Sequence, residues 1–206
     1  MMSKTEFLKR WSQLHNDAPV TGIVGAWLSI SYRFGLVATL LRISPNVLTL
    51  LGLLSAIATG FTALSIWGII FIVFSLFLDG IDGSVAIFQK RESNRGAILD
   101  SVADRISEAL WLVAFYRIGV PAWISIVLWV IASVQEYARA RLSSLGVNEL
   151  GVVTPAERPV RASFIFIAFF MWHLGITGIT ALSIVFLLLQ TISLYLVVRF
   201  SRSQLR

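Results

Sequence analysis

The stretch Trp67–Tyr116 reads WGIIFIVFSLFLDGIDGSVAIFQKRESNRGAILDSVADRISEALWLVAFY, and its pattern decides the fold. Its two apolar runs, residues 67–88 and 96–116, each have the length of about 20 residues that a helix needs to cross a bilayer. Because only the short polar stretch 89–95 separates them, the two helices are expected to be antiparallel neighbours. The stretch therefore predicts two adjacent membrane-spanning helices with acidic residues near their connected ends.

The composition of the whole chain agrees with a membrane protein. The chain has 206 residues, of which 57% are hydrophobic and 14% charged, and its mean hydropathy is +0.82. Soluble domains average about 45–50% apolar and about 25% charged residues, so a disordered chain, a coiled coil and an ordinary soluble enzyme are excluded. Further apolar runs cover residues 47–66, 121–142, 159–174 and 177–198. We expect an all-α integral membrane protein in which residues 43–206 form a catalytic domain of six transmembrane helices.

Residues 1–42 are expected to form a juxtamembrane, interfacial segment. Within residues 3–18, apolar side chains recur at helical spacing, at Phe7, Leu8, Trp11 and Leu14. This spacing predicts a short amphipathic helix on the membrane surface, although a frayed N-terminus is the alternative. No apolar run follows the first residues closely, so we expect no secretory signal peptide.

The basic residues predict the orientation in the membrane. The 17 Lys and Arg outnumber the 11 Asp and Glu, and the formal net charge is +6. With six spans and residues 20–42 at the interface, only Arg117 falls on the second side. The other 16 share the first side: Lys4, Lys9, Arg10, Arg33, Arg42, Lys90, Arg91, Arg95, Arg105, Arg139, Arg141, Arg158, Arg161, Arg199, Arg202 and Arg206. The positive-inside rule then places both termini in the cytoplasm and the protein in the cell membrane, and no nucleic-acid partner is needed to explain the charge.

Four aspartates fall inside the apolar runs, where charge is expensive and indicates function. Asp79 and Asp82 share one helix face at i, i+3 spacing, and Asp100 and Asp104 share another at i, i+4 spacing. The four carboxylates are expected to converge near the cytoplasmic interface. The chain has no cysteine, and such an all-oxygen cluster suits a pair of Mg²⁺ or Mn²⁺ ions that handle phosphoryl groups. The alternative is a set of salt bridges with Arg91, Arg95 and Arg105.

The same residues resemble the signature of the CDP-alcohol phosphotransferase family. The resemblance rests on Asp79-x2-Asp82-Gly83-x2-Ala86-x9-Gly96-x3-Asp100-x3-Asp104, and on Pro45-Asn46-x2-Thr49 before the first span. It implies a homodimeric membrane enzyme that transfers a phosphatidyl group from CDP-diacylglycerol to an alcohol and releases CMP. By resemblance, all four aspartates bind the two divalent ions, and Asp104 is also the general base. The residues of the cytidine nucleotide site would be Gly83, Ala86 and Gly96.

One residue departs from the family pattern. The family usually has Arg directly after the signature alanine, and here the position holds Ile87. An apolar side chain cannot bind phosphate. Since Arg91 lies one helical turn further on, we expect Arg91 to take over this nucleotide contact.

Arginines on the predicted cytoplasmic side are candidates for holding the acceptor. Arg139 and Arg141 end the fourth span, and Arg158 and Arg161 begin the fifth. Guanidinium groups bind phosphate bidentately, although positive-inside topology alone would also place arginines here. By resemblance to phosphatidylinositol-phosphate synthases, these four residues would bind the phosphate of a phosphorylated polar alcohol. Inositol phosphate is the expected acceptor and glycerol 3-phosphate the next.

Two other functions remain open from sequence. An ion-coupled transporter would use the aspartates to carry ions, but such proteins often place charge at the midplane of broken helices. A non-catalytic family member acting as a membrane subunit would fit the loss of the arginine at Ile87. An assay for CMP release distinguishes the enzyme from both the transporter and the non-catalytic subunit.

Overall fold

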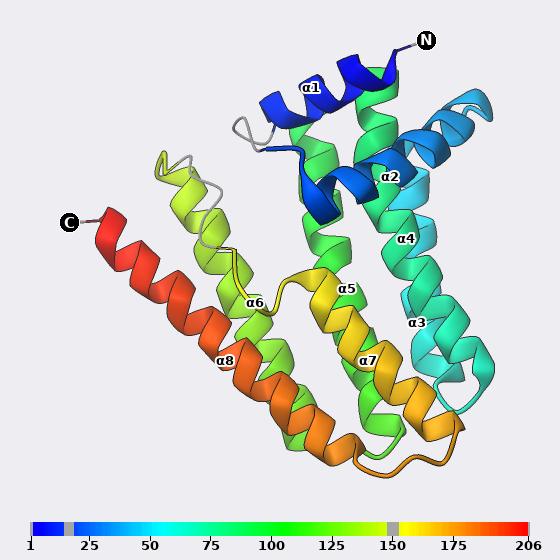
Figure 1. The fold of residues 1–206 in the computed structure, drawn as a ribbon, viewed down its shortest axis with the longest axis vertical. Coiled ribbons are helices and arrows are strands. Elements are labelled where there is room, and N and C mark those ends of the chain that lie inside the picture. The colour runs from blue at the N-terminus through cyan, green and yellow to red at the C-terminus, as the bar shows by residue number, and fades with distance from the viewer. Residues whose placement is uncertain (1, 15–18, 148–152, 206) are drawn as a thin grey trace. The chain divides into compact units, whose positions relative to one another are not determined.

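The computed structural model describes residues 2–14, 19–147 and 153–205, and every regular element within these ranges is a helix. This confirms the all-α prediction. Along the chain in Figure 1, the helices are α1 (Lys4–Leu14), α2 (Gly22–Leu40), α3 (Pro45–Thr62), α4 (Ile66–Gln89), α5 (Asn94–Arg117), α6 (Ala122–Ser144), α7 (Arg158–His173) and α8 (Ile179–Gln204).

The helices α3 to α8 coincide with the six apolar runs to within six residues at each end. By length and composition, three helices of the described chain can cross a membrane, namely α3, α4 and α8. Helices α5 and α6 have 24 and 23 residues, against 24 in α4, but each carries several charged residues in one half. Helix α7 has 16 residues, which extend about 24 Å against a hydrocarbon core of about 30 Å. The six-span topology therefore remains a prediction.

The N-terminal segment contains two helices. Helix α1 buries Phe7 completely, while Lys4 and Lys9 are exposed. Residues 20–42, expected at the interface, contain the apolar helix α2, and residues 15–18 lie outside the described chain. The position of either helix at a membrane surface remains a prediction.

The chain divides into two compact units. Unit 1 comprises Met1–Leu54 and Phe74–Asp104, and unit 2 comprises Ser55–Val73 and Arg105–Arg206. This division cuts through α3, α4 and α5, whereas the sequence predicts a functional boundary at residue 42.

In unit 1, small residues let α2 and α3 approach α4. The side chain of Ser31 on α2 donates a hydrogen bond to the Gly80 carbonyl and shares another with Ser84, 2.5 Å between the hydroxyl oxygens. A Cβ added at Gly80 would overlap with the Trp27 ring. On the other side, a Cβ at Gly52 of α3 would lie 3.4 Å from the Ser75 carbonyl of α4. These contacts fix the half of α4 that carries the aspartates.

Helix α1 closes one end of unit 1 (Figure 1). Phe7, Leu28 and Ile87 form a buried apolar cluster, and the Phe7 ring stacks on Phe88 with 5.0 Å between ring centroids. An ion pair between Arg10 and Glu92, 3.3 Å from nitrogen to oxygen, adds a polar contact. Helix α1 is therefore attached to the end of α4 by an apolar core.

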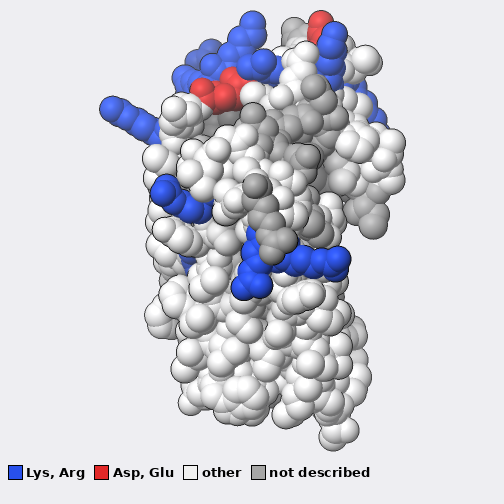
Figure 2. All heavy atoms as spheres, turned by 90° about the vertical axis from the view of Figure 1, so that its left-hand side faces the viewer, with Lys and Arg blue, Asp and Glu red and all other residues white. Residues whose placement is uncertain are grey.

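Unit 2 has an aromatic and aliphatic core. Trp111, Phe115, Phe169 and Phe186 are fully buried, and the Phe164 and Phe186 rings stack at 4.9 Å. The N-terminal parts of α6 and α8, residues 122–135 and 179–198, carry no charged residue. Accordingly, the lower part of the view in Figure 2 is white, without Lys or Arg.

Candidate functional site

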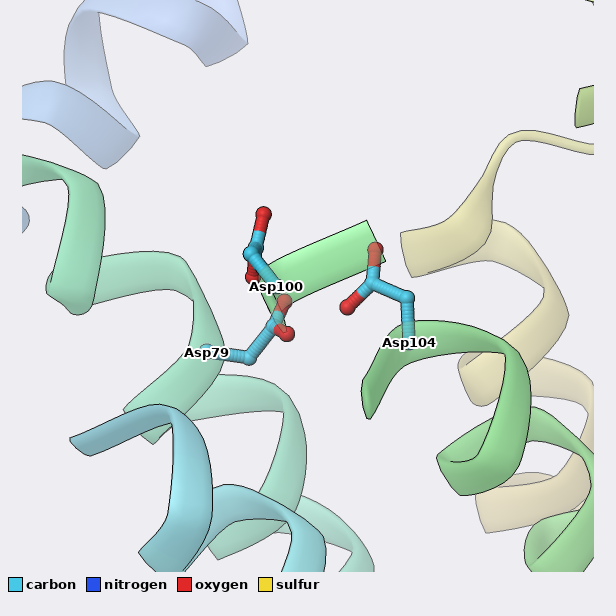
Figure 3. A group of neighbouring side chains, drawn as sticks. All are labelled: Asp79, Asp100 and Asp104. Carbon is cyan, nitrogen blue, oxygen red and sulfur yellow. The ribbon is translucent and has the colours of Figure 1, made fainter. Parts of the chain in front are cut away.

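Three aspartates of unit 1 form the candidate metal centre. One carboxylate oxygen each from Asp79, Asp100 and Asp104 lies within 4.8 Å of the others, and all three residues are half-buried. Asp79 comes from α4, and Asp100 and Asp104 come from consecutive turns of α5. Figure 3 shows the three carboxyl groups facing a common space.

The connection between α4 and α5 brings these residues together. Helix α4 ends at Gln89, and Lys90 adopts a left-handed conformation with φ of 51°. The Arg91 N–H then donates to the Ala86 carbonyl over 2.9 Å, a bond that closes a helix C-terminus. The Ser93 hydroxyl accepts from the Gly96 N–H over 3.1 Å and caps the start of α5. Backbone groups at the end of α4 and at the start of α5 are thus hydrogen-bonded within the connection between the two helices. This short connection lets α5 run back along α4.

The fourth aspartate has a different environment. Asp82 is only 7% exposed, and its Oδ2 accepts a hydrogen bond of 2.5 Å from the Thr49 hydroxyl on α3. Four carboxylates were expected to converge, and in the described chain three of them do. The carboxylate of Asp82 instead bonds to Thr49 of α3. Thr49 belongs to the motif that resembles the family, but spacing alone gave its side chain no role.

The donor set fits a hard divalent cation. All the groups are carboxylates, and oxygen ligands of this kind suit Mg²⁺ or Mn²⁺. Ligands about 2.1 Å from one Mg²⁺ lie at most about 4.2 Å apart, so oxygens within 4.8 Å reach a shared ion after a small side-chain movement. The three residues could hold such a group.

The residues predicted to bind the nucleotide also lie in unit 1. Gly83 is exposed on α4, and a Cβ added there would meet no atom within 4 Å. Ala86 is half-buried, and Gly96 lies near the Ser93 and Asn46 side chains. Arg91 is exposed directly after α4. Ile87, in contrast, is 3% exposed and contributes to the core beneath α1.

The four predicted acceptor arginines lie in unit 2, and Arg161 is the most buried of them at 3% exposure. Its Nε donates to Glu108 over 2.8 Å, its Nη2 lies 2.7 Å from Glu108 and 3.1 Å from Glu136, and its Nη1 donates to the Ala156 carbonyl. Glu108 also pairs with Arg105 over 2.6 Å. Arg161 therefore joins α5, α6 and the segment before α7 within the interior of unit 2.

Arg139 makes a bidentate pair with a carboxylate. Its Nη1 and Nη2 donate to the two oxygens of Glu157 over 2.8 and 2.7 Å. Although burial raises the pKa of Glu157, hydrogen bonds from Arg139 and Thr154 lower it to about 2. Sequence reasoning assigned nothing to Glu157 or Thr154, because no periodicity links them to Arg139.

The other two arginines contact Trp111 and Ser144. The Arg158 guanidinium lies over the buried Trp111 ring, 5.2 Å from its centroid, in a cation–π contact. Arg141 is exposed and donates to the Ser144 hydroxyl over 3.3 Å.

Comparisons with known proteins point to one family. A sequence model described as CDP-alcohol phosphatidyltransferase matches residues 42–200. An archaetidylinositol phosphate synthase of Aeropyrum pernix is 37% identical over 130 residues, which cover 58% of this chain and 65% of that protein. A phosphatidylinositol phosphate synthase of Streptomyces avermitilis is 34% identical over 154 residues, which cover 68% of this chain and 63% of that protein. The chain thus spans just under two thirds of the length of these relatives.

Solved structures share the fold. A Mycobacterium tuberculosis phosphatidylinositol phosphate synthase with CDP-DAG bound superposes with a TM-score of 0.70 at 19% identity and covers 84% of this chain and 94% of its own. A structure of that enzyme with manganese and citrate gives a TM-score of 0.71 at 18% identity, with 84% and 88% of the two chains covered. At this level of identity the likeness concerns the fold.

Proposed function

Because the chain belongs to the CDP-alcohol phosphatidyltransferase family, we propose that it transfers a phosphatidyl group from CDP-diacylglycerol to inositol phosphate and releases CMP. The observation that carries the proposal is the group of Asp79, Asp100 and Asp104 within 4.8 Å. These residues stand at the positions that define the family signature, and carboxylates this close fit divalent cations.

The chemistry follows from the residues of unit 1. Asp79, Asp82, Asp100 and Asp104 would hold two Mg²⁺ or Mn²⁺ ions, which neutralise the pyrophosphate and stabilise the charge that develops on CMP. Asp104 accepts the proton of the acceptor hydroxyl. The oxygen of that hydroxyl bonds to the lipid phosphorus, and the bond between this phosphorus and the oxygen of CMP breaks. Open space at Gly83 leaves room for the nucleotide beside α4, with Ala86 and Gly96 near it and Arg91 as the cationic contact.

The acceptor is inferred from the relatives and the arginines. The relatives from A. pernix and S. avermitilis differ in the lipid that their names imply, but both names contain inositol phosphate. In unit 2, Arg139, Arg158 and the exposed Arg141 would contact the acceptor phosphate. The buried pairs of Arg161 with Glu108 and Glu136 favour a positioning role for Arg161 beside that contact.

We propose the same membrane arrangement that the basic residues predict. Helices α3 to α8 cross the cell membrane, both termini and the aspartates lie on the cytoplasmic side, and α1 lies along the surface. This depth keeps the lipid tails in the bilayer while soluble groups enter from the cytoplasm. The enzyme is proposed to act as a homodimer, which chemical cross-linking in membranes tests.

The decisive experiment measures CMP release by the purified protein in lipid nanodiscs. The assay contains CDP-diacylglycerol, Mg²⁺ or Mn²⁺, and one acceptor at a time: inositol phosphate, glycerol 3-phosphate, free inositol or serine. We expect turnover with inositol phosphate, and loss of at least about 100-fold in Asp104→Asn, since general base catalysis contributes about 10²–10⁴-fold. Glu92→Gln, an acid-to-amide change elsewhere in unit 1, is the matched control and should retain activity.

The outcomes separate the alternatives. Turnover with glycerol 3-phosphate alone would move the acceptor and keep the enzyme class. Absence of CMP release with every acceptor would overturn the proposal and leave a non-catalytic membrane subunit or an ion-coupled transporter.

A further inference from the structure

Unit 2 contains an anion-binding cradle that the protein fills with its own side chain. We define the cradle as the Arg139 guanidinium together with the Thr154 backbone N–H and hydroxyl. All three groups donate to Glu157: the guanidinium over 2.8 and 2.7 Å, the Thr154 N–H over 2.8 Å and the hydroxyl over 2.7 Å. A planar guanidinium fork combined with a backbone N–H and a hydroxyl is the donor set that binds phosphate as well as carboxylate.

The cradle is held in place from the interior of unit 2. Thr154 is 5% exposed, and its hydroxyl also faces the amide of Gln135, 3.4 Å away. Gln135 is completely buried and accepts from Gln190 of α8 over 2.9 Å. The next buried residue, Ala156, donates its N–H to the Ser193 hydroxyl over 2.9 Å. The segment around Thr154 is thus anchored to α6 and α8, so the donors keep their positions when the anion changes.

Glu157 is the most exposed member of the arrangement. It precedes α7 as the N-cap residue, but its side chain makes no capping hydrogen bond to that helix. Its side chain is 30% exposed, whereas that of Arg161 is 3% exposed. Rotation of Glu157 into solvent would leave the helix end unchanged and expose the cradle to another anion.

We propose that Glu157 occupies the site of the acceptor phosphate and must leave it before a phosphorylated alcohol binds. The proposal rests on the proposed function and deepens it, because it makes Glu157 a residue that sets the affinity for the acceptor. Intramolecular competition lowers the apparent affinity by the fraction of molecules in which the cradle is open. A free alcohol lacks the phosphate and does not compete with Glu157.

The test compares wild type with Glu157→Gln, which keeps the shape and the acceptor oxygen but removes the charge. We expect the KM for inositol phosphate to fall about threefold to tenfold, with kcat and the KM for CDP-diacylglycerol unchanged. In an Arg139→Gln background the gain should disappear, since the cradle is then incomplete. Glu92→Gln changes another arginine-paired glutamate and should leave the KM for inositol phosphate as in wild type.

A second readout needs no turnover. Inorganic phosphate should raise the thermal unfolding midpoint of Glu157→Gln by more than that of wild type, in the absence of donor lipid and metal. Glu157→Ala should show the same direction and replaces Glu157→Gln if that variant fails to fold. An unchanged or higher KM, together with an equal or smaller phosphate response, would overturn the proposal. If wild type releases no CMP, the proposed function is overturned instead. The shift of the thermal midpoint with phosphate would still decide whether Glu157 fills an anion site.

Discussion

The Thr49 hydroxyl of α3 donates a 2.5 Å hydrogen bond to the carboxylate of Asp82 on α4. Both residues are buried, at 5% and 7% exposure. The bond joins two helices that approach each other closely at Gly52, where an added Cβ would lie 3.6 Å from the backbone nitrogen of Asp79. The same packing therefore holds Asp79, which lies three residues before Asp82. Removing such a donor from a buried carboxylate lowers the free energy of unfolding by more than the hydrogen bond itself contributes, because one carboxylate oxygen is left without a partner.

Thr49→Val removes the hydroxyl while keeping the shape of the side chain. We expect the free energy of unfolding to fall by about 1–3 kcal/mol, and activity to fall with it, because Asp82 loses its orientation. Thr49→Ser keeps the hydroxyl and should lose less than half as much. Unfolding in detergent micelles followed by circular dichroism measures both, and equal losses in the two variants would contradict a role for the hydrogen bond.

Divalent cations should stabilise the folded protein even without substrate. If Asp79, Asp100 and Asp104 bind Mn²⁺, a free Mn²⁺ concentration of 100 times the Kd adds about 2.7 kcal/mol to the free energy of unfolding. We expect Mn²⁺ to raise the thermal midpoint of wild type and EDTA to reverse the rise. Asp100→Asn should lose most of the response, while Glu92→Gln should keep it. A rise that persists in Asp100→Asn would place the responsible ion elsewhere.

The helices were predictable because their signal is local. The length of each apolar run and the polar residues that separate the runs determine where α3 to α8 begin and end. The pairing of Asp100 with Asp104 likewise follows from one helix turn, and the short connection after Gln89 brings them to Asp79.

The polar partners were not predictable because they are distant in sequence. Thr49 and Asp82 are 33 residues apart, Arg139 and Glu157 are 18 apart, and Arg161 and Glu108 are 53 apart. No periodicity marks such pairs, since packing between helices determines which side chains meet. For the same reason, the sequence did not reveal that two of the four predicted phosphate ligands, Arg139 and Arg161, pair with glutamates.

Two glycines on α4 should respond oppositely to alanine. At Gly83 an added Cβ meets nothing within 4 Å, so Gly83→Ala should stabilise the helix by about 0.5–1 kcal/mol. At Gly80 the Cβ would overlap with the Trp27 ring, so Gly80→Ala should destabilise the protein by about 1–3 kcal/mol. If the nucleotide approaches Gly83, Gly83→Ala should also raise the KM for CDP-diacylglycerol although the fold is more stable. Thermal unfolding and CMP release measure the two effects separately, and an unchanged KM would remove Gly83 from the nucleotide site.

Restoring the family's arginine at Ile87 should damage this protein. Ile87 is 3% exposed against Phe7 and Leu28, so Ile87→Arg places a charge in an apolar cluster. Burial of an unpaired charge is unfavourable, and we expect α1 to detach, with a loss of several kcal/mol in unfolding free energy. Ile87→Leu conserves the volume and should lose less than about 1.5 kcal/mol. Protease cleavage near α1 reports the detachment, and a gain of activity with α1 still protected would contradict the assignment of Ile87 to the core.

Acid should weaken the contribution of Glu157 to stability. The folded protein lowers the pKa of this carboxyl from 4.5 to about 2, against the effect of burial, through hydrogen bonds from Arg139 and Thr154. A lowered pKa means that the stabilisation is fully present above about pH 4.5 and declines as the pH falls toward 2. We expect wild type to exceed Glu157→Gln by about 1–2 kcal/mol near neutral pH, a value reduced because the pair is partly exposed to solvent. Thermal midpoints of both proteins should approach each other between about pH 5 and pH 3, and in an Arg139→Gln background the difference should be small throughout. A difference between wild type and Glu157→Gln that stays constant over this range would show that the ion pair does not stabilise the fold.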